Sequence, residues 1–426
     1  MQPRNANVEP GNRNDTLAVV GAGVVGLCTA LQAQRQGFRV TLIDREEPGT
    51  GASFGNAGYL ATELVEPLSS AKTLRSALSM WLNPDGPLAL PLGYLHRIMP
   101  WLVRFVVAAR PAQVARSRQG LLALNLGAVP AWQRCLDDIG AGGQLCRSGY
   151  LLVWESASGL EDARRHAESL QRYGMPTELV QGARLAELEP ALAGRVNHAL
   201  YFPEACQVRE PYRLCQLLFA AFQARGGSFL QQEVAALRPE SHGVVLETGA
   251  GCLDFDRAIV CTGAWGKRLL QGVGVRVPLQ AERGYHLSFA AASTCLRRPI
   301  GSAERRFVMS PLDSGLRAVG FTELGGLKLK PVRRRYASLR RHSQALLPGL
   351  SDPAVEVREW MGHRPTLPDS LPVIDRHPQH ERLLFAFGNQ HLGLTQAAIS
   401  AELVVSLMQG TPPPIDPAPY RVTRFH

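Results

Sequence analysis

A glycine-rich turn between an apolar strand and a helix, near the N-terminus, most constrains the fold of this 426-residue chain. Residues 17–20 form a short apolar run typical of a buried parallel strand, and Gly21-Ala22-Gly23-Val24-Val25-Gly26 follows directly. Apolar residues then recur at helical spacing until Gly37, and residues 39–43 predict a second strand that ends at Asp44. This order of strand, G-x-G-x-x-G, helix, strand and acid predicts a Rossmann-like unit.

Each glycine of such a unit has its own role in holding a dinucleotide. Gly21 permits the tight turn, Gly23 lets a pyrophosphate approach the positive end of the helix, and Gly26 lets helix and strand pack closely. Asp44 stands 18 residues after Gly26, near the spacing expected for an acceptor of ribose hydroxyls. The pattern therefore predicts binding of an adenine dinucleotide. The alternative is a glycine-rich turn in an unrelated α/β unit.

Two later segments extend this interpretation. Residues 50–59 are a run of small residues whose amides suit a further phosphate or a flat ring, although a plain flexible loop has the same composition. Residues 383–387 predict a strand, 388–393 a turn, and apolar residues from 394 to 408 mark one helix face that ends before Gly410. The N-terminus of that helix suits the negative pole of a ring system.

The composition and the net charge indicate the class of protein and the kinds of ligand to expect. The hydrophobic fraction of 45% and the charged fraction of 19% are typical of a globular chain, and the length favours two domains. The net charge of +10 favours acidic substrates, an anionic cofactor or a membrane surface. Without an aromatic platform or a recognition-helix pattern, we expect no nucleic-acid binding.

The cysteines and the chain start bear on metals and on location. None of the eight cysteines forms a C-x-x-C pair, so we expect no metal site, and unpaired cysteines suit a reducing cytoplasm. Residues 1–15 are polar and lack an apolar signal core, and no run is apolar enough to predict a transmembrane helix.

Four motifs together resemble the D-amino-acid oxidase superfamily of FAD enzymes, from about Leu17 to Gly410. They are Gly51-Ala-Ser-Phe-Gly-Asn-Ala-Gly58, Ile259-Val-Cys-Thr-Gly-Ala-Trp265, Gly362-His-Arg-Pro-Thr-Leu-Pro-Asp-Ser-Leu-Pro-Val-Ile-Asp375 and Gly388-Asn-Gln-His-Leu-Gly393. Among subfamilies the chain is most similar to bacterial D-amino-acid dehydrogenase of the small-subunit type. The features in common are Asn56-Ala57-Gly58, Arg283-Gly-Tyr-His286 and the basic, apolar stretch near residues 87–118.

The resemblance implies FAD and a set of residues that hold it. Sarcosine oxidases carry a flavin-linking cysteine just before the motif at 364, where this chain reads Glu359-Trp-Met-Gly-His363, so we expect noncovalent FAD. The cofactor-binding residues carried over are Gly21, Gly23, Val24, Val25, Gly26, Asp44, Arg45, Ser53, Asn56, Ala57, Gly58, Val234, Thr262, Gly263, Gly388, Leu392, Gly393, Leu394 and Thr395.

The expected fold class is α/β (α+β), with a Rossmann-like FAD-binding domain and an inserted antiparallel-sheet substrate domain. Because the cofactor motifs fall at the start, middle and end of the chain, the FAD-binding domain is expected in three parts, 14–90, 205–276 and 364–426. The substrate domain is expected in two, 91–204 and 277–363.

Four residues are candidates for the chemistry. The family places its carboxylate-binding arginine at the motif position of Arg364, although an arginine in a proline-rich loop can also be a plain surface residue. Tyr285 and His286 lie on a predicted strand, where neighbours alternate faces, so only one of them is expected to face the flavin. His391 lies in the turn next to the flavin by motif, and a histidine that only caps the loop is the alternative. We nominate no general base.

The resemblance implies oxidation of D-amino acids, or of D-proline-type imino acids such as D-hydroxyproline, by hydride transfer to flavin. The electron acceptor is expected to be a quinone or a partner subunit, with oxygen as a further acceptor. Alternatives are a glycine- or sarcosine-type oxidase that uses oxygen, the flavin subunit of a multi-subunit amino-acid dehydrogenase, and a nonenzymatic nucleotide sensor.

The expected location is the cytoplasm, with peripheral contact on the inner face of the membrane. That contact is predicted through the stretch from Leu88 to Arg118, where apolar residues recur near helical spacing among arginines. A buried helix with salt-bridged arginines is the alternative. The residues concerned are Leu95, Ile98, Trp101, Leu102 and Phe105, with Arg97, Arg104 and Arg110 between them.

Overall fold

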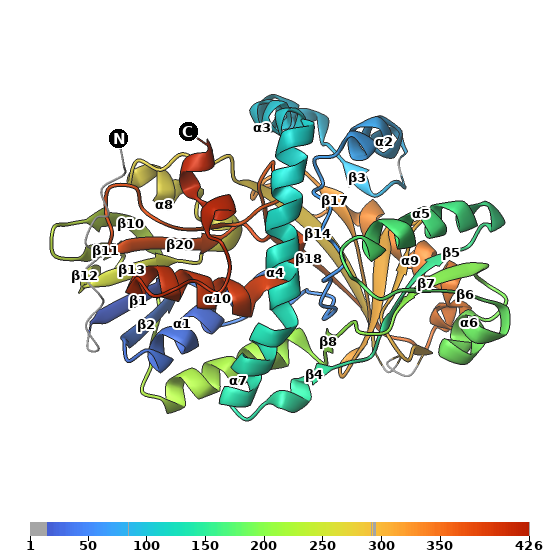
Figure 1. Ribbon diagram of the computed structural model, residues 1–426, viewed down its shortest axis with the longest axis horizontal. Coiled ribbons are helices and arrows are strands. Elements are labelled where there is room, and N and C mark those ends of the chain that lie inside the picture. Colours follow the sequence, from blue (N-terminus) through green and yellow to red (C-terminus); the bar gives the residue numbers. More distant parts are fainter. Residues whose placement is uncertain (1–14, 84, 291, 293–294, 426) are drawn as a thin grey trace.

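The computed structural model describes residues 15–83, 85–290, 292 and 295–425. The polar N-terminal segment, on which we expected no signal core, lies outside the described residues up to position 14. Two sheets with their helices lie side by side, and chain segments far apart in sequence meet in each (Figure 1). The fold is the expected mixture of a Rossmann-like layer and a mostly antiparallel sheet.

The first sheet has six strands, of which all but β19 run parallel to their neighbours. Its first strand sends alternate side chains to opposite faces, and both faces are buried. Leu17 and Val19 pack in the cluster that contains α1 and α10, whereas Ala18 and Val20 pack toward a small three-stranded sheet. In sheet order the strands are β19 (Val373–Arg376), β20 (Leu383–Phe387), β13 (Arg257–Val260), β1 (Thr16–Val20), β2 (Arg39–Asp44) and β9 (Ser228–Gln231).

Four helices cover one face of this sheet and the small antiparallel sheet covers the other. The α10 helix packs between α1 and α4, and α7 packs on α1. Although α10 has the length and hydropathy of a membrane span, most of it is buried, so it is a core helix. The elements are α1 (Val24–Arg35), α4 (Pro111–Asp138), α7 (Pro211–Ala224), α10 (Gly393–Gln409), β10 (Val234–Pro239), β11 (Val244–Thr248) and β12 (Gly251–Phe255), with α8 (Lys267–Gly272) against β10.

The second sheet is largely antiparallel and forms one wall of the site. Helix α9 (Arg333–Leu346) packs on its outer face against Tyr285, Leu287 and Phe289. Its strands, in order, are β18 (Val357–Thr366), β14 (Gln280–Phe289), β17 (Gly315–Glu323), β16 (Phe307–Leu312), β15 (Ile300–Ser302), β5 (Tyr150–Trp154), β7 (His198–Phe202) and β6 (Glu178–Gln181), and β3 (Leu88–Ala89) pairs with β17. The short strands β4 (Leu145–Cys146) and β8 (Gln207–Val208) pair separately, and α5 (Leu160–Gln171) and α6 (Gly182–Leu188) lie near β7.

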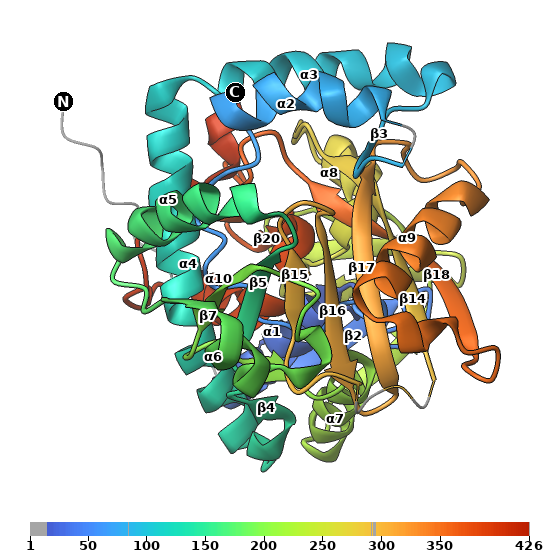
Figure 2. The same cartoon turned by 90° about the vertical axis from the view of Figure 1, so that its right-hand side faces the viewer.

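Two helices, α2 (Ala71–Leu82) and α3 (Leu95–Ala108), form a layer at one end of the molecule, as Figure 2 shows. The apolar face on which we based membrane contact is turned inward. Ile98 and Trp101 are buried with Leu324, and Leu95, Leu102 and Phe105 pack partly buried against them. That face is therefore not the one exposed to a membrane.

Candidate functional site

A cavity of about 1680 Å³ lies between the two sheets and reaches under α2 and α3. Its walls come from the glycine turn after β1, the segment 49–64, the ends of β10 and β13, and the inner face of the second sheet. Small-molecule sites usually have volumes of about 300–1,000 Å³. This cavity has room for a dinucleotide together with a substrate.

The glycine turn has the geometry that the sequence predicted. Gly21 adopts φ +111°, and a Cβ on Gly26 would lie 1.8 Å from the carbonyl oxygen of Gly21. Any side chain at position 26 would therefore push the helix off the strand. Val24 N, the first amide of α1, donates to Ser53 Oγ (3.0 Å), and Ala22 N in the turn before it donates to Asp44 Oδ2 at the end of β2 (2.7 Å).

The other end of the cavity meets the N-terminus of α10. Gly393 begins this 17-residue helix, and a Cβ placed on it would have no neighbour within 4 Å. The open space beside a helix N-terminus suits a group with negative character. The glycine turn and this helix end both lie on the wall of the cavity, where they would hold FAD, and FAD when bound supplies a hydride acceptor.

Most of the cofactor residues predicted from the sequence lie on the walls of this cavity. They are Gly21, Gly23, Val24, Val25, Asp44, Arg45, Ser53, Asn56, Ala57, Val234, Thr262, Gly263, Gly388, Gly393 and Leu394. The guanidinium of Arg45 lies 3.7 Å from the ring centroid of Trp265, at the same end as Val234.

Four predicted cofactor residues are not part of the wall, and each has a packing role instead. Gly26 faces Gly21, and a Cβ on Gly58 would meet Val208 O and Leu312 at 2.8 Å. Leu392 is buried in the core cluster of α10. The Thr395 hydroxyl accepts a hydrogen bond from Ala61 N at 3.1 Å, which ties α10 to the segment after the second glycine loop.

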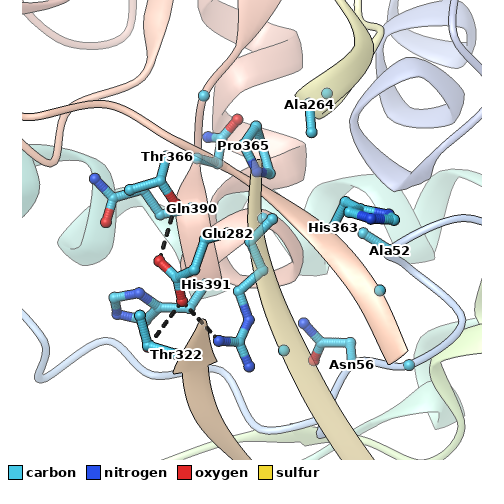
Figure 3. A pocket seen from close by; sticks show the side chains of 18 of the residues that line it. Ala52, Asn56, Ala264, Glu282, Thr322, His363, Pro365, Thr366, Gln390 and His391 are labelled. Atoms are coloured by element: carbon cyan, nitrogen blue, oxygen red, sulfur yellow. Dashed lines mark hydrogen bonds and ion pairs between the residues drawn. The ribbon is translucent and has the colours of Figure 1, made fainter. Parts of the chain in front are cut away.

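Arg364 lies on the wall and is held by a buried carboxylate. Its Nη1 donates to Glu282 Oε1 (2.8 Å) and to Phe321 O (3.1 Å). Thr322 and Thr366 also donate to the Glu282 carboxylate, at 2.9 and 3.0 Å (Figure 3). Burial acts to raise the pKa of Glu282, but Arg364, His391 and these donors together hold it below its ordinary value. Glu282 is therefore a carboxylate that orients Arg364.

The backbone also fixes the position of the Arg364 guanidinium. A bulge in the β14–β17 pairing leaves Phe321 at φ 64° and directs its carbonyl to Arg364. A Cβ on Gly284 would lie 2.4 Å from Cζ and Nη2 of Arg364, so the guanidinium lies over a residue that must be glycine. Neither Glu282 nor the role of Gly284 was predicted from the sequence, because both depend on the pairing of β14 with β18.

Tyr285 and His286 point to opposite faces of β14, as expected for neighbours on a strand. The Tyr285 side chain is buried on the outer face of the sheet, and its hydroxyl donates to Glu323 Oε2 at 2.9 Å. His286 does face inward, but its Nδ1 is 3.2 Å from Gly55 O, its ring stacks on Trp360, and it does not line the cavity. Gly284 is the residue of this strand beneath Arg364, and a contact of Tyr285 or His286 with the substrate stays a prediction.

His391 lies on the cavity wall close to Glu282 (Figure 3), and Arg364 is near enough to act on its charge. Burial lowers its pKa to about 4, with Arg364 acting in the same direction and Glu282 against it. The ring is therefore neutral at pH 7. The Nε2 atom of the neighbouring wall residue His363 is buried and has no partner among the described residues.

The fold and the site together define a dinucleotide-binding enzyme whose second sheet presents a seated arginine to the cofactor cavity. A family model described as FAD dependent oxidoreductase matches residues 16–407, so the chain belongs to that family and its cofactor is FAD. Within the described residues, no group of three His, Cys, Asp or Glu side chains is arranged to hold a metal ion.

Three comparisons illustrate the relationship. The chain is 31% identical over 417 residues to a D-amino-acid oxidase of Bradyrhizobium diazoefficiens, covering 96% of this chain and 98% of that protein. It is 28% identical to D-amino acid dehydrogenase 2 of Ralstonia nicotianae, covering 96% and 100%. The crystal structure of glycine oxidase from Geobacillus kaustophilus superposes with a TM-score of 0.77 at 22% identity, covering 97% and 99%.

Proposed function

We propose that this chain is an FAD-dependent dehydrogenase of D-amino acids or of D-proline-type imino acids. The observation that carries the proposal is the guanidinium of Arg364, fixed by Glu282 on the wall of a cofactor cavity. Bound FAD would accept the hydride from the substrate α-carbon. The two relatives named above as D-amino-acid enzymes, which match nearly the full length, support the substrate class.

Arg364 has donors left for a substrate carboxylate. Only Nη1 is engaged, and no described residue accepts a hydrogen bond from Nη2 or Nε. These two atoms form the edge of the fork that binds a carboxylate with two parallel bonds. Glu282 prevents the guanidinium from rotating, so the substrate is oriented when its carboxylate binds. His391 stays neutral beside this pair and does not repel the substrate amine.

The FAD is proposed to be bound without a covalent link. Cys261 is the cysteine among the described wall residues, and burial raises the pKa of its thiol to about 12. A thiol that stays protonated is a poor nucleophile. The segment at 359–363, where sarcosine oxidases carry their linking cysteine, contains none.

For the electron acceptor we propose a quinone delivered from a membrane surface. The outward face of α3 is apolar, with Met99, Val103 and Val106 about half exposed, at 49, 57 and 55%. Between residues 67 and 136 the sequence has eight lysines and arginines and a single acid, Asp85. Apolar helix faces with basic flanks bind anionic lipid surfaces. Beneath this layer the cavity wall is apolar, and includes Leu74, Met80, Leu88, Leu102 and Phe105.

Anaerobic mixing of the purified holoenzyme with single amino acids tests the proposed function. D-amino acids and D-hydroxyproline should bleach the flavin absorbance, and their L-enantiomers should not. Bleaching by glycine and sarcosine alone, with peroxide formed in air, would identify a glycine-type oxidase instead. Turnover of the isolated chain with a dye acceptor would argue against a subunit that only relays electrons. A flavin that no amine bleaches would reject the proposal.

A further inference from the structure

Glu63 is a buried carboxylate on the wall of the cavity that the anchoring of the substrate carboxylate does not use. The residue is 7% exposed, and the Tyr59 hydroxyl donates to its Oε2 at 2.6 Å. The ring of Tyr59 stacks on Tyr150, with centroids 4.2 Å apart. All three residues line the same cavity as Arg364. A carboxylate and two phenol rings therefore meet at one place on the wall.

The second sheet sets how far this cluster lies from the carboxylate anchor. A Cβ on Gly301 of β15 would lie 2.0 Å from the Tyr150 hydroxyl, so the Tyr150 ring reaches across to β15. Strand β17, whose Thr322 bonds Glu282, is two strands from β15 in the sheet. At ~4.8 Å per spacing these strands are about 10 Å apart, and Thr322 lies three residues further along β17 than Val319, which is level with Gly301 through Val308. A substrate held at Arg364 needs a long side chain to reach Glu63.

No positive charge in the described part of the chain neutralises Glu63. No lysine or arginine forms an ion pair with it there, and its facing groups are Tyr59 of its own segment and Tyr150 of β5, with Cys206 beside Tyr59. Asp162 and His166 of α5 line the same cavity. Burial raises the pKa of Glu63 to about 7, although the hydrogen bond from Tyr59 acts to lower it.

We propose that Glu63, with Tyr59 and Tyr150, binds the distal cation of a long substrate side chain, an ammonium or a guanidinium. The inference rests on the proposed function and specifies its substrate class. A carboxylate gains most from a partner that is both charged and a hydrogen-bond donor, and aromatic rings beside it add cation–π attraction. The Tyr150 hydroxyl makes no hydrogen bond to another described residue and is left to bind the same group.

The pH dependence is a consequence of this arrangement. A cation binds the ionised form of Glu63, which becomes the major form as pH rises through about 7. The kcat/KM for a cationic substrate should rise through this range relative to a neutral isostere. Deprotonation of the substrate amine affects both substrates alike, so it cancels in the ratio.

D-Arginine and D-citrulline, which differ mainly in side-chain charge, make the matched test. The wild-type holoenzyme should favour D-arginine in kcat/KM, and Glu63→Gln should lower that ratio by about 10- to 100-fold and abolish its rise with pH. The control is Glu66→Gln, whose residue pairs with Arg118 at the surface and does not line the cavity. Glu66→Gln should leave the ratio unchanged.

Two outcomes would overturn the inference. One is an unchanged D-arginine to D-citrulline ratio in Glu63→Gln with normal FAD content. The other is an equal loss for both substrates, which would mark Glu63 as structural. If no amino acid bleaches the flavin, the proposed function fails, and binding still decides the inference. In that case the Kd for each ligand is measured from the change in the flavin spectrum. 5-Guanidinopentanoate should bind more tightly than hexanoate in wild type but not in Glu63→Gln.

Discussion

At the scale of single residues, the site contains an arginine that a glutamate, two threonines and a glycine hold in place. Arg364 was predicted from a motif, but Glu282 and Gly284 were not. The reason is that Glu282 meets Arg364 only through the register of β14 with β18, across 82 residues of chain. A single sequence contains no signal for that pairing, whereas turn glycines such as Gly21 are visible because their role is local.

Arg364→Ala should lower kcat/KM for the best amino acid by about 30- to 1000-fold, because a paired, charged contact contributes roughly 2–4 kcal/mol. Arg364→Lys should recover little of this, since an ammonium has no planar fork. On the wild-type enzyme, the kcat/KM of the amide of the same substrate should be lower than that of the acid by a similar factor. Steady-state kinetics measures kcat/KM, with FAD content as the control. A near-wild-type kcat/KM in Arg364→Ala would mean that the carboxylate binds elsewhere.

Gly284→Ala tests the position of the same guanidinium without removing its charge. The new Cβ would lie 2.4 Å from Cζ, so the guanidinium must move and kcat/KM should fall by about 10-fold or more. Gly272→Ala is the matched control, because a Cβ there meets nothing within 4 Å. Equal kcat/KM in the two variants would show that catalysis does not require the guanidinium of Arg364 to lie over Gly284.

At the scale of secondary-structure elements, the sequence predicted β1, α1, β2, β20 and α10 but not the strands β15 and β18, which form part of the wall of the site. Periodicity in residues 95–105 predicts a helix, and α3 forms there. However, this helix is apolar on two sides, and the side with Trp101 packs inward while the side with Val103 stays exposed. Periodicity identifies a buried face only when the opposite face is polar.

The exposed side of α3 should determine lipid binding. Val103→Asp should reduce binding of the holoenzyme to anionic liposomes at low salt by about tenfold or more, because a carboxylate opposes both apolar burial and anionic lipid. Gln223→Glu, an exposed residue of α7, adds a negative charge elsewhere and should change binding little. Liposome flotation makes the comparison, and a wild-type protein that never floats would reject the membrane surface.

At the scale of the whole molecule, the cofactor cavity lies between two sheets that belong to different parts of the fold. The second sheet contains strands from residues 88–89, 150–202 and 280–366, and the first contains strands from residues 16–44, 228–231, 257–260 and 373–387. The division into FAD-binding and substrate parts stays a prediction, and strand β3 of the second sheet falls within the part expected to bind FAD, 14–90. Strand β18 crosses the boundary expected at 363.

FAD should be releasable and should stabilise the whole fold. Acid precipitation should leave the pellet colourless and FAD in the supernatant. Because the ligand binds the native state only, free FAD at ~100 times its Kd should add about 2.7 kcal/mol to the free energy of unfolding. Thermal unfolding with and without added FAD measures this, and colour retained in the pellet would indicate a covalent link.

Neighbouring strands of the first sheet are synthesised far apart in time. Strand β1 has β2 on one side and β13 on the other, and Thr16 N donates to the side chain of Asp256, 240 residues later. At ~5–20 residues per second, a ribosome needs about 12–48 s to make that length. The β1–α1–β2 unit leaves the ribosome with two apolar strand edges, and the edge of β1 has no neighbour until the end of this interval, whereas β9 can pair with β2 earlier. Such edges bind other unfinished chains, so the yield of soluble protein in a cell should depend on chaperones that cover this unit until β9 and β13 arrive.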